Sequence, residues 1–209
     1  YVDATFGGGS HSREIMKHLS KGKIIAFDQD EDTKRNVIND KRFMLINANY
    51  RYLKNFLRYH DAIPVKGILA DLGISSHQID VPDKGFSTRY DAALDMRMDQ
   101  KQSLTAWNVV NEYDEKELFG ILKNFGEIKN AGKLAQAIIK SRKENPINTT
   151  GQLVSIARPL ASGNLTNKYL SQVFQAIRIE VNQELENLKT FLEQSKEVIA
   201  KNGRLVVIA

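Results

Sequence analysis

A single carboxylate, Asp71, lies near the end of an apolar stretch of the chain. Residues Val65–Leu72 read VKGILADL, and Gly73 interrupts the pattern directly afterwards. Such a run is typical of a buried parallel strand, and open α/β sheets bind their ligands at the carboxyl ends of these strands. We therefore expect Asp71 to hold part of a ligand or a reacting amine, with Gln78 as a further hydrogen-bonding group. The alternative is that Asp71 caps a helix.

A glycine turn near the start of the chain forms a second candidate site. Val2–Ser12 reads VDATFGGGSHS, which predicts a strand, a tight turn and a helix. Glycines there allow positive φ and close approach of a ligand, while the helix offers free N–H groups. Asp28 follows Gly9 by nineteen positions (28 − 9 = 19) and ends the next apolar run. An acid at this place can accept hydrogen bonds from the ribose of an adenosine ligand. The alternative is a structural glycine turn beside a surface acid.

The sequence of the glycine turn restricts which adenosine ligands can bind there. The glycines do not fit G-x-G-x-x-G, and no G-K-[ST] motif is present, which argues against a dinucleotide and against ATP hydrolysis. Asp3, in the first strand, would repel a pyrophosphate but can accept hydrogen bonds from an ammonium group. S-adenosylmethionine is a nucleoside that carries such a group.

The polar segment Lys84–Asp99 contains Arg89 and Arg97 among several aspartates. A long segment without apolar periodicity inside a compact domain usually has a function. Its arginines could bind phosphates. They could equally pair with the neighbouring aspartates and fix the segment, because acid and arginine alternate in Asp95-Met-Arg97-Met-Asp99.

Other polar side chains are candidates for contact with a polyanion. A polar stripe on one predicted helix consists of Gln172, Gln175, Arg178 and Asn182. These side chains could face the active-site cleft, or they could simply face solvent. A basic group, which would bind in a salt-dependent way, consists of Lys129, Lys133, Lys140, Arg142 and Lys143.

Composition sets the class of protein. The chain has 209 residues, 42% of them hydrophobic, so it can bury a substantial core. It has no cysteine, and its four histidines lack metal-binding spacing, so we expect no metal site. The net charge of +5 fits a polyanionic partner or ordinary solubility. No run is long enough to span a bilayer and no signal peptide is visible, which predicts a cytoplasmic protein.

Apolar strands alternate with helical patterns in the first third, and this alternation predicts a doubly wound α/β fold with a parallel sheet. Helices are expected after Asp32 and Arg51, and Gly203 is expected to end a helix. Both ends of the chain look cut from a longer polypeptide. The predicted strands are Tyr1–Phe6, Lys23–Asp28, Phe43–Asn47, Val65–Leu72 and Arg204–Ala209.

Between the fourth and fifth strands the pattern is helical, which predicts an inserted helical subdomain. The last apolar stripe, from Leu170 to Leu192, steps by three or four and predicts one very long helix. We expect α/β core segments at 1–104 and 181–209 around a helical insertion at 105–180 that recognises the substrate. The helix boundaries are predicted by the capping pairs Asp114–Glu117 and Thr149–Gln152 and by Pro146.

Several motifs together resemble one family. VDATFGGGSHS, AFDQD, ILADLGISSHQID, KGFSTR with LDMRMD, and FQAIRIEVNQELE are similar to those of the bacterial ribosomal RNA small subunit methyltransferase H family. The resemblance runs in order along the whole chain. It implies a class I, Rossmann-like methyltransferase fold with a helical insertion. It also implies transfer of a methyl group from S-adenosylmethionine to the N4 amine of a decoding-centre cytidine in 16S ribosomal RNA. An N-terminal lead-in and a C-terminal segment with an H-S-L-E-D-like motif are expected outside this chain.

The resemblance also assigns residues to the cofactor. Tyr50 would lie beside the adenine and Asp28 at the ribose, and the remaining cofactor residues would be Gly9, Ser10, His11, Asp71 and Gln78. Ser10 stands where the family usually has Gly, and Tyr50 where it usually has Phe. The stretch Asn167–Gln172 replaces the family's more usual His-Pro-Ala segment.

For the reaction, Asp71 is the candidate acceptor of the amine proton, and Ser75 and Ser76 are weaker candidates. The candidate substrate residues are Arg89, Arg97, Arg178 and Asn182. The expected partner is small-subunit ribosomal RNA, within the 30S subunit, and a homodimer is possible. Two alternatives stay open: a methyltransferase of the same fold with another substrate, and a non-catalytic RNA-binding module.

Overall fold

The structure is a computed structural model that describes residues 1–209, apart from the side chain of Ser76. The chain forms two compact units. The first comprises Tyr1–Ser75 and Leu185–Ala209, and the second comprises Ser76–Glu184. Within the described residues, no helix has the length and apolar character needed to cross a membrane.

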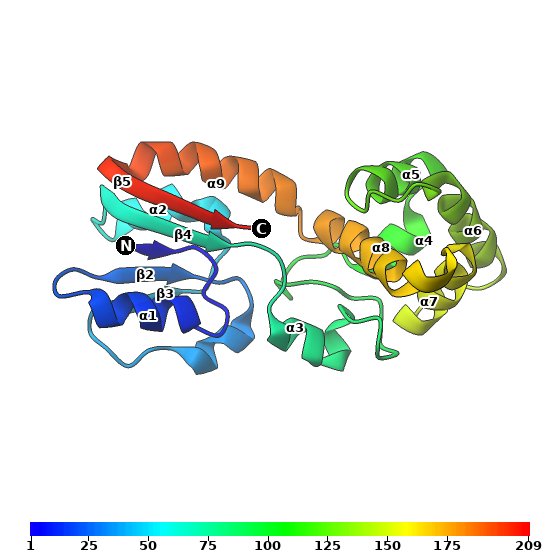
Figure 1. Cartoon of the computed structure of the whole chain (residues 1–209), viewed down its shortest axis with the longest axis horizontal. Helices are drawn as coiled ribbons and strands as arrows, with labels where there is room; N and C mark the ends of the chain where they lie inside the picture. Colours follow the sequence, from blue (N-terminus) through cyan, green and yellow to red (C-terminus); the bar gives the residue numbers. More distant parts are fainter. The chain divides into compact units, whose positions relative to one another are not determined.

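A five-stranded sheet with the order β3-β2-β1-β4-β5 forms the first unit (Figure 1). All neighbouring strands in it run parallel. The order reverses between β1 and β4, and this is the switch point at which doubly wound sheets bind ligands. The predicted Rossmann-like α/β fold is confirmed. The strands are β1 (Val2–Asp3), β2 (Ile24–Phe27), β3 (Phe43–Ile46), β4 (Val65–Asp71) and β5 (Ile199–Ile208).

Helices cover both faces of this sheet. On one face, α2 (Leu53–Tyr59) and α9 (Glu184–Val198) share an apolar cluster with the strands. Phe191 and Leu57 are completely buried in it, and each contributes about 1.5–3 kcal/mol by leaving water. A smaller cluster holds α1 (Ser10–His18) through Met16, which packs with Ile24 of β2.

The first unit departs from the sequence prediction at three places. Strand β1 is shorter than expected, and the segment near Asp32 forms the 3-10 helix η1 (Glu31–Asn36). The prediction that Gly203 ends a helix was wrong, because α9 ends at Val198 and Gly203 lies inside β5. A Cβ at Gly203 would lie 2.6 Å from the side chain of Ile199, so a close approach within an irregular strand requires this glycine.

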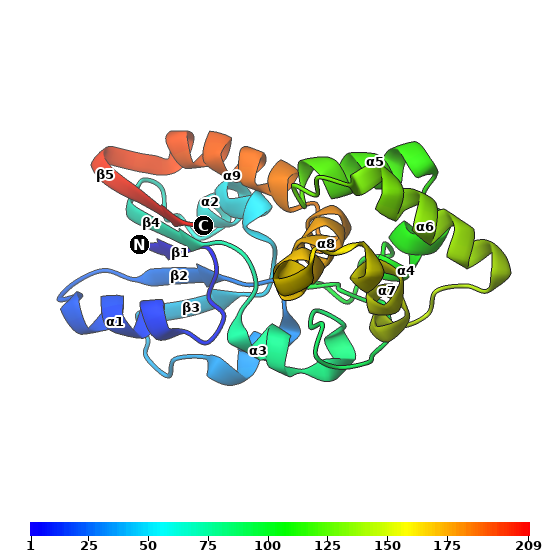
Figure 2. The same ribbon diagram turned by 45° about the vertical axis from the view of Figure 1, so that its right-hand side comes forward.

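The second unit is mainly helical, and Figure 2 shows α4 to α8 gathered into a bundle. Capping boxes at Asp114–Glu117 and Thr149–Gln152 start two of the helices, as predicted. Helix α6 ends before Pro146, also as predicted. The helices are α3 (Ser76–Asp80), α4 (Ala106–Glu112), α5 (Glu115–Asn124), α6 (Ala131–Glu144), α7 (Thr150–Ala157) and α8 (Thr166–Val181).

The single long helix predicted from Leu170 to Leu192 was wrong. The chain leaves the helix after Val181, and Gln183 has a φ of 50°. Helix α9 then begins at Glu184. The side chain of Asn182 bonds to a neighbouring loop at this break, and this competes with continuation of the helix.

The expected division into residues 1–104, 105–180 and 181–209 stays a prediction. The compact units change over at other residues, because 76–104 belongs to the second unit. In that segment Phe86, Leu94, Met96 and Met98 are buried, so apolar anchors hold a loop that otherwise reads as polar.

Candidate active site

The glycine turn after β1 has the geometry that its sequence predicts. Gly7 and Gly9 have φ of 51° and 77°, in the left-handed region. A Cβ at Gly9 would lie 2.8 Å from the ring of Phe6, whereas a Cβ at Gly7 or Gly8 would meet nothing within 4 Å. The turn therefore packs tightly at Gly9 and leaves space for a ligand at Gly7 and Gly8. Ser10 is the first residue of α1.

Asp28, just beyond the end of β2, joins this turn. Its Oδ2 accepts a hydrogen bond from the Gly7 N–H at 2.8 Å, and its Oδ1 accepts one from Asp30 N–H at 2.9 Å. Burial raises the pKa of Asp28 to about 6, against these two hydrogen bonds, and nearby Asp30 and Asp3 add to the increase. Carboxylate oxygens have further lone pairs, so Asp28 can still accept bonds from hydroxyl groups. Its contact with a ribose stays a prediction.

Asp3 has a structural position. Its side chain is fully buried, accepts a 2.6 Å hydrogen bond from Ser12 Oγ, and accepts another from Thr5 N–H at 3.2 Å. Burial raises its pKa, despite these bonds. Asp3 thus ties β1 to α1, and its expected contact with a ligand ammonium stays a prediction.

Asp71 is the last residue of β4 and lies beside His11 of α1. The His11 Nε2 and Asp71 Oδ2 atoms are 3.2 Å apart, and the side chains are 46% and 45% exposed. The Asp71 N–H donates to Thr5 Oγ1 at 2.7 Å, which fixes the backbone at this point. No helix follows until α3 begins at Ser76, so the alternative role of Asp71 as a helix cap was wrong.

The other two predicted cofactor residues lie in different units. Tyr50 starts the short 3-10 helix η2 (Tyr50–Tyr52) in the first unit, and its ring packs edge-on against Phe191 with centroids 5.2 Å apart. Gln78 lies on α3 of the second unit and is buried. The side chain of Ser76, a weaker candidate for the reaction, lies outside the described part of the chain.

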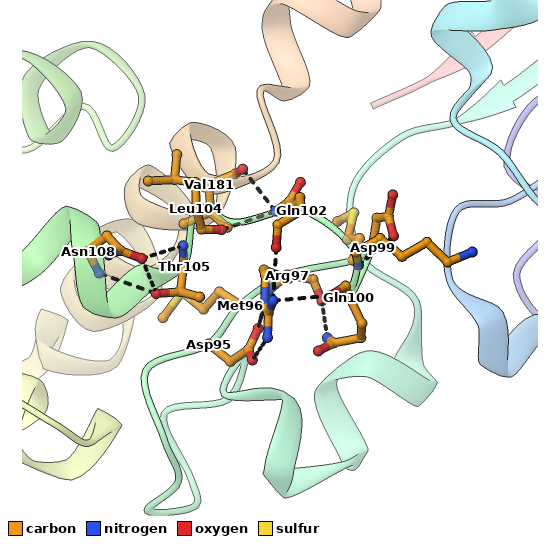
Figure 3. Close-up of polar contacts among 12 residues, drawn as sticks. Asp95, Met96, Arg97, Asp99, Gln100, Gln102, Leu104, Thr105, Asn108 and Val181 are labelled. Atoms are coloured by element: carbon orange, nitrogen blue, oxygen red, sulfur yellow. Dashed lines mark hydrogen bonds and ion pairs between the residues drawn. The ribbon is translucent and has the colours of Figure 1, made fainter.

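In the second unit Arg97 is the centre of a polar cluster (Figure 3). It forms a two-pronged pair with Asp95, at 2.9 Å from Nε to Oδ1 and 2.8 Å from Nη2 to Oδ2. Its Nη1 donates to the carbonyls of Gln100 at 3.1 Å and Gln102 at 2.9 Å. Partial burial raises the pKa of Asp95, but the bonds from Arg97 outweigh it and the pKa is lowered. Of the two alternatives, internal pairing is what the structure shows for Arg97, while Arg89 is exposed.

Asn182 and Arg178 also bond within the second unit. The buried Asn182 accepts from Met98 N–H at 2.8 Å and donates to the Met96 carbonyl at 2.8 Å. Arg178 pairs with Glu184 at 2.8 Å. Contact of Arg178 and Asn182 with RNA stays a prediction. Sequence reasoning missed the Asn182 contacts, although an asparagine within a helical pattern is a recognised signal of such bonding.

The basic residues of α6 divide into two groups. Lys133, Lys140 and Lys143 are exposed. Arg142 instead donates to the carbonyls of Val110 at 2.7 Å and Tyr113 at 2.6 Å, which caps the end of α4. Among the residues that the structure describes, no three His, Asp or Glu side chains gather to hold a metal ion.

The parallel sheet, with its glycine turn and its acids at the carboxyl edge, defines a Rossmann-like methyltransferase fold. The sequence profile of the MraW methylase family matches residues 1–209, and the chain belongs to this family. The resemblance inferred from the motifs is thereby confirmed.

Three curated relatives carry the name ribosomal RNA small subunit methyltransferase H. The protein of Flavobacterium johnsoniae is 54% identical over 210 residues, which cover 100% of this chain and 70% of the relative. The protein of Cytophaga hutchinsonii is 53% identical over 211 residues, with 100% and 71% covered. That of Bacteroides thetaiotaomicron is 52% identical over 209 residues, with 100% and 69% covered.

Proposed function

We propose that this methyltransferase transfers a methyl group from S-adenosylmethionine to the N4 amine of a cytidine in the decoding centre of 16S ribosomal RNA. The observation that carries the proposal is the half-exposed Asp71, at the carboxyl edge of the sheet beside the glycine turn. The names of the relatives support ribosomal RNA of the small subunit as the substrate. We propose that the reaction takes place on the 30S subunit in the cytoplasm. A homodimer stays a prediction.

The residues at this edge fit S-adenosylmethionine. Open space above Gly7 and Gly8 permits close approach to the backbone. Asp28 can accept hydrogen bonds from the ribose hydroxyls, and Tyr50 can pack its aromatic ring beside the adenine. The remaining proposed cofactor residues of the first unit are Gly9, Ser10, His11 and Asp71, and Gln78 of the second unit is a separate proposal. When bound, the cofactor supplies a methyl group on a positively charged sulfur.

Asp71 has a proposed role in the reaction itself. The N4 lone pair of cytosine is shared with the ring, so the enzyme must orient the amine and remove a proton as the N–C bond forms. A carboxylate accepts hydrogen bonds from this amine readily. Asp71 would hold the amine in line with the methyl group and accept its proton, while His11 at 3.2 Å restricts the orientation of the carboxylate.

RNA must present the cytidine outside its stack. We propose that the second unit, including the 105–180 segment, supplies most of the substrate contacts. Arg89 and the α6 lysines would bind phosphates. Arg97 in the loop, and Arg178 and Asn182 at the end of α8, would support these contacts, because their internal bonds maintain the shape of this region.

Transfer of labelled methyl groups to small ribosomal subunits that lack the modification tests the proposal. We expect the label on the N4 position of one cytidine, identified by nuclease digestion and mass spectrometry. Label on protein or on another base would contradict the proposed substrate. Binding of S-adenosylmethionine without any transfer would instead favour a non-catalytic RNA-binding protein.

A further inference from the structure

An aromatic groove lies on the first unit, outside the proposed active site. It has a volume of about 530 Å³ and is lined by Ala48, Tyr52, Asn55, Phe56 and Tyr59. This volume is within the usual range for small-ligand sites, which is about 300–1,000 Å³.

Some aromatic rings of residues 50–59 pack into the core of the first unit, and others are exposed. Tyr50 packs against Phe191, and Phe56 packs edge-on against Phe27 with ring centroids 6.0 Å apart. In contrast, Tyr52 is 46% exposed and Tyr59 is 81% exposed. The core therefore does not account for these two tyrosines, and burying them on a partner would remove a large apolar area from water.

A cation lies beside one exposed tyrosine and a second ring beside the other. The guanidinium carbon of Arg51 lies 5.5 Å from the centre of the Tyr52 ring, and the ring of His60 contacts Tyr59 with centroids 5.0 Å apart. Arg58 is exposed. The nearby carboxylate of Glu197 is paired with Lys54, so its negative charge is compensated.

We propose that this groove binds an unpaired nucleobase of the RNA substrate, at a place separate from the cytidine that is methylated. Aromatic faces with adjacent arginines are the usual means of binding single-stranded RNA, because rings stack on bases while cations attract phosphates. Asn55 adds an amide that can bond to a base edge. Because Ala48 follows β3 by two residues, the groove begins at the carboxyl edge of the sheet, where the proposed active site also lies. The inference rests on the proposed RNA substrate.

Variants of the most exposed ring test the proposal. Affinity is measured for an oligocytidylate of about twelve nucleotides and for an abasic strand of the same length. We expect Tyr59→Ala to weaken binding of the oligocytidylate roughly five- to a hundredfold and to leave the abasic strand unchanged. Tyr59→Phe should bind like the unmodified protein, because the stacking face is kept. Leu192→Ala, which shortens another exposed side chain of the same unit, is the control and should change neither affinity.

Three outcomes would overturn the inference. Equal affinity of Tyr59→Ala and the unmodified protein for the oligocytidylate would show that no base stacks there. Loss of S-adenosylmethionine affinity in Tyr59→Ala would make the groove part of the cofactor site. A dimer that this substitution converts to a monomer would make it an interface between copies. Methyl transfer by the unmodified protein is measured separately. A negative result for base binding in the groove can therefore be distinguished from a negative result for the proposed function.

Discussion

The acids beside the glycine turn of the first unit and those of the loop cluster in the second unit are held in different ways. In the first unit Asp3 and Asp28 lie in partly or fully buried positions, and burial raises the pKa of both. In the second unit, bonds from Arg97 lower the pKa of Asp95, and bonds from Thr149 and Gly151 lower that of Asp91. Asp3 and Asp28 therefore bond to backbone N–H groups and a hydroxyl, whereas Asp95 is paired with an arginine.

This difference separates a ligand site from a structural cluster. Asp28 and Asp71 bond to backbone N–H groups and to His11, and their oxygens retain acceptor capacity. Both oxygens of Asp95 are occupied by one guanidinium, which also holds the carbonyl of Gln102. An acid of the first kind is available to a substrate amine or hydroxyl. One of the second kind maintains the shape of a loop.

Removing the charge of Asp71 is expected to have the largest effect on activity. Asp71→Asn should lower kcat about 10²–10⁴-fold, because the amide cannot accept the amine proton. The melting temperature should change little, since Asp71 is half exposed and its backbone contact to Thr5 remains. Methyl transfer to small subunits and thermal denaturation measure the two effects. Asp95→Asn is the matched control, and we expect it to reduce stability more than kcat. A fully active Asp71→Asn variant would contradict the proposed role.

Asn182 tests the structural cluster. Asn182→Ala leaves Met98 N–H and the Met96 carbonyl without this partner, which should lower the free energy of unfolding by about 2–4 kcal/mol. Gln175→Ala, which removes an exposed bond to the Phe125 carbonyl at 3.1 Å, is the control and should cost less than about 1 kcal/mol. Urea denaturation compares the variants. Equal costs would mean that the loop is not held by Asn182.

Much of the first unit could be predicted because its strands are buried and regular. Expected strands at Lys23–Asp28 and Phe43–Asn47 match β2 and β3 to within two residues. The βαβ alternation predicts that β1 and β2 are parallel neighbours, so the meeting of Asp28 with the glycine turn could also be anticipated. Capping boxes marked two helix starts in the second unit because their signal is local.

Contacts between segments that are distant in the chain could not be predicted from the sequence. Val181 and Leu185 continue the spacing of the apolar stripe, so apolar periodicity alone does not predict the break at Asn182. Tertiary bonds from Asn182 to the Met96–Met98 loop accompany that break. The contact between His11 and Asp71 joins residues 60 positions apart, and nothing in the spacing predicts it. In contrast, the Asp95–Arg97 pair is local and was one of the two alternatives expected.

The raised pKa of Asp28 should make the affinity for S-adenosylmethionine depend on pH. The free protein protonates Asp28 below about pH 6. Hydroxyl donors bind the ionised form, so affinity for S-adenosylmethionine should fall as pH decreases through 6, by at most about tenfold per pH unit. The same group should stabilise the folded protein as pH falls from about 6 towards 4, because its folded pKa lies above the unfolded value. Titration calorimetry across this range should show the change of affinity with pH. Asp28→Asn should bind S-adenosylmethionine more weakly, and its affinity should not change with pH. If the affinity of Asp28→Asn still changes with pH in the same way, a group other than Asp28 causes the pH dependence.

The smallest expected effects distinguish basic residues that bind RNA from basic residues that stabilise the fold. Lys133→Gln and Lys140→Gln should each weaken RNA binding only severalfold and lower the salt dependence of the binding constant by about 0.7 per residue, because each removes about one phosphate contact. Arg142→Gln removes the same charge from the same helix, but its guanidinium bonds to Val110 and Tyr113. We therefore expect Arg142→Gln to lower the melting temperature and leave the salt slope unchanged. Filter binding at several salt concentrations, with thermal denaturation, measures both. A reduced slope for Arg142→Gln, or an unchanged slope for both lysine variants, would mean that exposure on α6 does not identify the phosphate-binding residues.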